Sequence, residues 1–213
     1  MAVASLQALI ERIALASSDA EIAAARADFV GRTGTFEPDE PFYEERVRAA
    51  FDDAVTAFGA PRAAMLRRWL VQHDEPRTRA LLRTWRTLLQ VEKVSEHAQV
   101  RVLLTDAEFL LVRDDGPAGK LREGDLFDGR LFVHEGVRLL PGPVFFERDA
   151  HQAIGEVLAE ARRHERGSEA SCDALLRMQM RRLRQPGLRV HHVYRWDAFD
   201  RTEMLAAPWV RPR

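Results

Sequence analysis

The sequence predicts an α+β protein, in which helices at both ends flank a small antiparallel β-barrel or curled sheet of the SH3-like or OB-like kind. Apolar residues recur every three to four positions in 1–92, nearly alternate in 93–147 and return to helical spacing in 148–213. The central strands are short and joined by turns, which favours antiparallel pairing and closure of the sheet edges. Because each helix carries an apolar stripe that needs a partner, we expect one compact domain overall.

The first segment begins with two predicted helices. Ser18, followed three residues later by Glu21, fits a capping box that restarts the chain after a first helix ends at Ala16. Gly31 ends the second helix. Apolar side chains at helical spacing line both: Leu6, Leu9, Ile10 and Ile13 in the first, and Ile22, Ala25 and Phe29 in the second.

Three further helices are expected before residue 93. Pro41 suits the first turn of one helix. A short helix is expected over 63–70, and Asp74 with Pro76 begins another. Their main apolar faces comprise Val47, Phe51, Val55 and Phe58 in the first of these helices and Leu81, Leu82, Trp85, Leu88 and Leu89 in the last. The helical unit is therefore expected to extend to residue 92.

The central segment contains five apolar runs of strand length, at 94–105, 108–113, 125–134, 137–140 and 144–146. Turn-forming residues separate several of these runs: Asp114-Asp115-Gly116-Pro117, Glu135-Gly136 and Pro141-Gly142-Pro143. Connections this short join antiparallel neighbours, so the segment predicts a small barrel rather than a parallel sheet.

The C-terminal segment returns to helices. Asp149 is placed to cap one helix, and a last helix ends at Pro186-Gly187. Residues 188–194 are expected to add a strand. The apolar faces are Ile154, Val157, Leu158 and Ala161 in the first helix and Cys172, Leu176, Met180 and Leu183 in the second.

Composition favours a cytoplasmic protein without a membrane segment. The 213 residues are 46% hydrophobic, which is enough for a sizeable core. Charged residues interrupt every apolar run, including Glu11 and Arg12 near the start, so no secretory or membrane-spanning stretch is recognised. Cys172 is the only cysteine, which excludes an internal disulfide and fits a reducing compartment.

The chemical motifs tested in the sequence fail, so no catalytic, cofactor-binding or metal-binding residue is predicted. The seven histidines are scattered and HExxH is absent. Gly119-Lys120 lacks the serine or threonine of a phosphate loop, and no GxSxG occurs. An enzyme is therefore not expected, although a site assembled from distant residues stays open because such sites are recognised by geometry.

Four segments together resemble an uncharacterised bacterial protein family, best represented in myxobacteria. They are FEPDEPFYEERVRAAF at 36–51, LLRTWRTLLQVEKV at 81–94, LREGDLFDGRLF at 121–132 and FFERDAHQAI at 145–154. The resemblance covers most of residues 28–165 and implies a strand-rich centre between helices. A histidine that the family pattern places near Phe146 is replaced here by Glu147. The resemblance implies no activity.

The basic C-terminal quarter carries the functional prediction. Residues 161–213 hold 12 basic and 6 acidic side chains, and the candidate interaction surface comprises Arg177, Arg181, Arg182, Arg184 and Trp209. The leading hypothesis is a non-catalytic protein-interaction or regulatory module that binds another protein. The alternative is a nucleic-acid-binding module that uses the basic helix and the barrel. The arginines could instead pair with the acidic centre, including Asp106.

Overall fold

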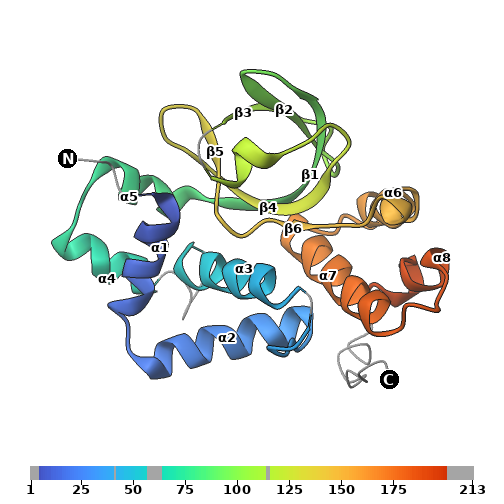
Figure 1. Cartoon of the computed structure of the whole chain (residues 1–213), viewed down its shortest axis with the longest axis horizontal. Coiled ribbons are helices and arrows are strands. Elements are labelled where there is room, and N and C mark those ends of the chain that lie inside the picture. The colour runs from blue at the N-terminus through green and yellow to red at the C-terminus, as the bar shows by residue number, and fades with distance from the viewer. Residues whose placement is uncertain (1–4, 41, 57–63, 114–115, 201–213) are drawn as a thin grey trace.

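Helices at both ends of the chain flank a closed β-barrel, which confirms the α+β prediction (Figure 1). The computed structural model describes residues 5–40, 42–56, 64–113 and 116–200. Four sequence predictions lie outside the described residues: the helix start at Pro41, the apolar contact of Phe58, the turn at Asp114-Asp115 and the role of Trp209.

The N-terminal helices pack around their own apolar cluster. Their bounds are Leu6–Leu15 for α1, Asp19–Thr33 for α2, Tyr43–Thr56 for α3, Ala64–Gln72 for α4 and Pro76–Ala80 for α5. The capping box of Ser18 and Glu21 is confirmed at the start of α2. Phe132 and Leu140 from the barrel complete this cluster, so the helical unit and the barrel share a core.

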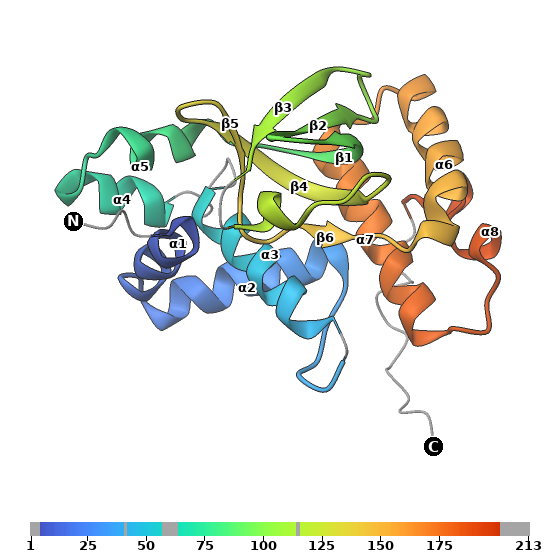
Figure 2. The same ribbon diagram turned by 45° about the horizontal axis from the view of Figure 1, so that its top comes forward.

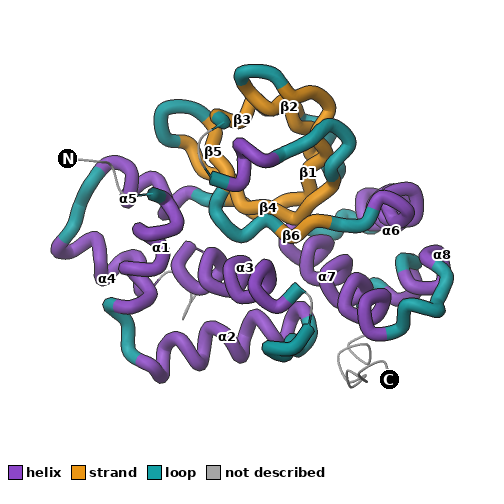
Figure 3. The backbone as a smooth tube through the Cα atoms, in the orientation of Figure 1, coloured by secondary structure: helices purple, strands orange, loops and turns teal. Residues whose placement is uncertain are grey.

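The barrel closes because β1 pairs with both β2 and β4 (Figure 3). The strands are β1 Trp85–Val94, β2 His97–Val102, β3 Glu108–Val112, β4 Leu126–Val133, β5 Val137–Leu139 and β6 Val144–Phe145. The pairing of β3 with β5 is parallel, at Leu111 and Val137, and is an exception to the expected antiparallel pattern. The circuit β1–β2–β3–β5–β4 matches the OB-like alternative.

The helix predicted to begin at Asp74 and Pro76 is confirmed only for Pro76–Ala80, and its predicted continuation through Leu89 is wrong. After α5 and a 3₁₀ turn at Leu81–Arg83, the chain enters β1 at Trp85. Leu88 packs among the helices and Leu89 packs inside the barrel, so this strand is buried on both faces. A strand buried on both faces loses its alternating pattern, and its leucines can then imitate helical spacing. The expected boundary at residue 92 therefore falls within β1.

Two of the three described C-terminal helices lie beside the barrel and beneath it, and the third packs against them away from the barrel (Figure 2). Their bounds are His151–Arg163 for α6, Ser168–Arg184 for α7 and Val190–Val193 for α8. The strand expected over 188–194 is wrong, because α8 occupies this stretch and Val193 and Tyr194 pack into the helical core. Among the described residues, no helix is both long and apolar enough to cross a bilayer.

Candidate functional site

The predicted basic surface is largely occupied by contacts within the molecule. Arg177 donates to two backbone carbonyl groups at 2.6 and 2.7 Å. Arg184 pairs with Glu40 at 2.9 Å, and only 4% of the Arg184 side chain is exposed. Arg182 donates to two carbonyl groups and contacts Asp149 at 3.3 Å. These three arginines therefore hold α7 against its neighbours.

Arg181 is bound less tightly than the other three arginines. Its guanidinium donates to the side chain of Gln185 at 3.5 Å, one helical turn further on. Among the described candidates, Arg181 is thus the one least engaged with other elements, and Trp209 lies outside the described residues. The predicted interaction surface stays a prediction.

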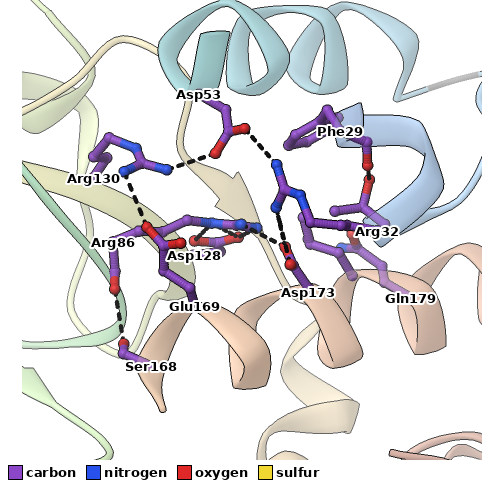
Figure 4. Close-up of polar contacts among 12 residues, drawn as sticks. Phe29, Arg32, Asp53, Arg86, Asp128, Arg130, Ser168, Glu169, Asp173 and Gln179 are labelled. Atoms are coloured by element: carbon purple, nitrogen blue, oxygen red, sulfur yellow. Dashed lines mark hydrogen bonds and ion pairs between the residues drawn. The ribbon is translucent and has the colours of Figure 1, made fainter. Parts of the chain in front are cut away.

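A buried charge network lies where the barrel meets the helices (Figure 4). Arg86 of β1 contacts Asp128 of β4 and Asp173 of α7, both at 2.6 Å. Arg32 of α2 extends the network from Asp173 to Asp53 of α3. Arg130 of β4 then contacts Asp53 at 2.7 Å. The buried charge network consists of these six residues: Arg32, Asp53, Arg86, Asp128, Arg130 and Asp173.

The register of the barrel explains why carboxylates gather there. Arg86 and Arg130 are direct cross-strand partners in the β1–β4 ladder, where two like charges repel each other. Each also faces away from the barrel interior, toward the helices, where water is excluded. Asp128, Asp53 and Asp173 compensate the two guanidinium groups from three different elements. The network therefore fixes the position of α3 and α7 on the barrel.

Arg86 and Asp173 stay ionised despite their burial. Burial alone would lower the pKa of Arg86, but Asp128 and then Asp173 raise it well above its ordinary value. Burial also opposes ionisation of Asp173, yet Arg86 and Arg32 hold its pKa below the ordinary value. The space beside the network is about 10 Å³, room for one water molecule at most. No substrate fits there, so this network is a structural device.

An open cleft lies further along the outer face of the barrel, between its β1–β2 wall and α6. Its volume is about 510 Å³, which is in the range of ligand-binding clefts. We call it the α6 cleft. Its floor and walls are lined by Gln90, Arg101, Leu103, Asp106, Leu126, His151, Gly155, Leu158, Ala159, Arg162 and Arg163.

Small residues of α6 keep the cleft open. Gly155 and Ala159 are four positions apart and so lie on one face of the helix. A Cβ atom at Gly155 would meet no atom within 4 Å, so packing does not require glycine there. Glycine inside a helix costs about 1 kcal/mol relative to alanine. Glycine at position 155 gains no packing in return for this cost, but it leaves room in the cleft.

The rim of the cleft carries three guanidinium groups and one carboxylate. Asp106 receives hydrogen bonds from both terminal nitrogens of Arg162 at 2.9 Å and lies 3.6 Å from Arg101. The hydrogen bonds from Arg162 hold the pKa of Asp106 below its ordinary value. Arg163 pairs with Glu160 on the same helix, and 69% of its side chain is exposed. The expected pairing of the basic C-terminal quarter with Asp106 is thus confirmed for Arg162.

Sequence reasoning missed the α6 cleft because its lining comes from β1, β2, the turn after β2, β4 and α6, which share no motif. Gly155 within an apolar helical pattern was the one local signal. The buried charge network had a clearer signal, since Asp128 and Arg130 alternate with apolar residues in a strand otherwise made for a core.

Two kinds of reactive site can be tested in the described parts of the chain: a metal-binding cluster and the single cysteine. No group of three or more histidine, cysteine or carboxylate side chains there could hold a metal ion. Burial raises the pKa of the Cys172 thiol well above its ordinary value, so this thiol is not a nucleophile. Comparisons with protein-family models, with curated proteins and with solved structures find no match to this chain. The family resemblance inferred from the sequence stays a prediction.

Proposed function

We propose that this protein is a non-catalytic protein-interaction module that holds a segment of a partner protein in the α6 cleft. The observation that carries the proposal is the cleft itself, with leucine side chains in its lining and guanidinium groups at its rim. Apolar contacts surrounded by polar side chains are the usual arrangement of a protein interface.

The rest of the fold supports this proposal by holding both walls of the cleft in place. The barrel wall belongs to a closed barrel that the buried charge network joins to α2, α3 and α7. The other wall, α6, packs into the helical core through Ile154 and Val157. A binding surface that is already ordered loses little conformational entropy when a partner docks, and its affinity is correspondingly higher.

The nucleic-acid alternative has less support. An OB-like barrel suggests it only by analogy of fold. Single-stranded nucleic acids are bound largely by stacking of bases on aromatic side chains. The outward positions of β2 and β3 include Gln99, Arg101, Glu108 and Leu110, while Phe109 packs into the barrel core. The geometry therefore favours a protein partner.

The proposal is tested by filling the cleft. The variant Gly155→Trp places an indole where a Cβ has no neighbour, so it should block the cleft without disturbing the core. Gly31→Trp is the matched control, because Gly31 is also a helical glycine with nothing within 4 Å of its Cβ position, and it lies on α2. The three proteins serve as bait in a native lysate of the source cells, after circular dichroism confirms that all are folded.

We expect a stoichiometric partner to be captured by the wild type and by Gly31→Trp, and to be lost from Gly155→Trp. Capture retained by Gly155→Trp would overturn the proposal, as would the absence of any stoichiometric partner. Salt-dependent binding of single-stranded oligonucleotides by the wild type would favour the alternative instead.

A further inference from the structure

Asp106 lies between two guanidinium groups of the α6 cleft, those of Arg162 and Arg101. It lies in the connection between β2 and β3, and its carboxylate bridges both terminal nitrogens of Arg162 in the two-point geometry that guanidinium forms with carboxylates. Arg162 also donates to the backbone carbonyl of Leu103. In Figure 2 the β2–β3 connection lies beside one end of α6.

The ion pair of Asp106 and Arg162 is exposed enough for Arg162 to exchange the Asp106 carboxylate for another anion. The Asp106 side chain is 55% exposed and the Arg162 side chain is 39% exposed. Exposed ion pairs contribute little stability, because water competes for both partners. Asp106 has a φ of 57°, in the left-handed region that aspartate and asparagine tolerate better than most residues, and its backbone N–H donates to the carbonyl of Val102 at 2.8 Å. The side-chain pair with Arg162, and not the backbone, is therefore the contact that can exchange.

The two guanidinium groups beside Asp106, those of Arg162 and Arg101, favour an anion in the same position. Asp106 is the only carboxylate among the residues that line the cleft. Just outside the lining, Glu92 pairs with Arg101 and Glu160 pairs with Arg163. Apolar side chains adjoin the charged rim, including Leu103 and Leu158. An occupant that satisfies both features carries a carboxylate next to an apolar side chain.

We infer that Asp106 is an internal stand-in for a carboxylate of the partner, and that an acidic, leucine-containing segment of the partner protein displaces it from Arg162. This inference rests on the proposed function. When the cleft is empty, Asp106 neutralises the rim. When the partner docks, its carboxylate takes the same guanidinium group, and the carboxylate of Asp106 moves into water.

The test compares the affinity of one acidic peptide for the wild type and for a variant that lacks the competing carboxylate of Asp106. The probe is acetyl-leucyl-aspartyl-leucine amide, and its asparagine twin is the uncharged control. Binding is followed by the ¹⁵N–¹H signals of the arginine side chains. Asp106→Asn removes the negative charge, and asparagine tolerates the same left-handed backbone conformation.

Asp74→Asn is the matched control variant. Asp74 also accepts two hydrogen bonds from one exposed arginine, Arg79, and its loss changes the net charge by the same amount. None of the residues lining the α6 cleft is involved in that pair. A general effect of charge would appear in both variants, whereas release of the competitor would appear only in Asp106→Asn.

We expect Asp106→Asn to bind the acidic tripeptide about five- to tenfold more tightly than the wild type, because a site occupied most of the time by its own carboxylate loses that factor in apparent affinity. Asp74→Asn should bind the acidic tripeptide with the affinity of the wild type. The asparagine twin of the tripeptide should bind neither Asp106→Asn nor the wild type. If the pair is only a clamp, Asp106→Asn will bind no more tightly than the wild type, and the inference fails. It also fails if millimolar tripeptide leaves the Arg162 signal of Asp106→Asn unmoved, or if the asparagine twin binds equally well.

The two proposals fail separately. Loss of partner capture in Gly155→Trp, together with unchanged tripeptide affinity in Asp106→Asn, would retain the interaction module and reject the role of Asp106. Capture that persists in Gly155→Trp would reject the module itself, whatever the tripeptide shows.

Discussion

The buried charge network and the rim of the α6 cleft use the same two kinds of side chain in opposite ways. In the network, the Arg86 and Asp128 side chains are only 6% and 5% exposed. At the rim, the Arg162 and Asp106 side chains are 39% and 55% exposed. The contact distances hardly differ, at 2.6 Å and 2.9 Å. Distance therefore does not separate a structural pair from an exchangeable one, and access to water does.

The physical reason lies in desolvation. An arginine that has lost its water depends on every carboxylate around it, since an uncompensated buried charge is very costly. An arginine at the rim can replace its carboxylate with water or with a ligand at little cost. The network thus makes the barrel and the helices one body, while the rim leaves guanidinium groups available to a partner.

Removal of Arg86 gives the largest expected effect. Arg86→Ala would leave Asp128 buried without its main partner and Asp173 with one arginine fewer. We expect the free energy of unfolding to fall by about 3 to 5 kcal/mol, measured by urea denaturation. Arg79→Ala is the control from an exposed pair and should change stability far less. Equal losses in the two variants would show that burial does not set the importance of these pairs.

Asp52 gives an intermediate effect that depends on pH. It adjoins the buried charge network on α3 and accepts a hydrogen bond from the backbone N–H of Gly142 at 2.7 Å. Burial raises the pKa of Asp52 to about 7 from an ordinary value of 3.8. The hydrogen bond from Gly142 and the charge of Arg130 lower this pKa by smaller amounts, and the charge of Asp53 raises it slightly. The folded protein therefore keeps a proton on Asp52 that the unfolded chain releases between about pH 4 and pH 7.

The raised pKa of Asp52 makes the folded state less stable as the pH rises from about 4 to about 7. In this range the folded state binds more protons than the unfolded chain. Asp52→Asn removes the titration and keeps an oxygen acceptor for Gly142. We expect the variant to gain stability relative to the wild type between pH 4 and pH 8, by at most about 4 kcal/mol, because one pKa unit is worth about 1.4 kcal/mol. Urea denaturation at a series of pH values measures the difference. A constant difference across the series would rule out a titrating Asp52.

The same contrast explains what the sequence could predict. The apolar spacing of α1–α3 and of β3–β5 predicted these elements, because each buries a single face or carries clear turn residues at its ends. β1 was misread as a helix, because Leu88 and Leu89 are buried on opposite faces. The α6 cleft was not predictable, because Arg101 and Arg162 meet only through the tertiary fold. The arginines of α7 formed a plausible surface in sequence, but the carbonyl groups and carboxylates that bind them lie on other elements.

Substitution of Arg163 gives the smallest expected change in stability and the clearest contrast with Arg86. Its side chain is 69% exposed, and its partner Glu160 is a neighbour on the same helix. We expect Arg163→Gln to change the free energy of unfolding by less than about 0.5 kcal/mol, as surface substitutions usually do.

Binding of the acidic tripeptide to Arg163→Gln should nevertheless weaken about two- to threefold, because one of three guanidinium groups at the rim loses its charge. Arg48→Gln, from the exposed pair with Glu44 on α3, is the matched control and should leave both quantities unchanged. If Arg163→Gln destabilises the fold as strongly as Arg86→Ala, the rim is part of the scaffold, and the distinction between the two regions does not hold.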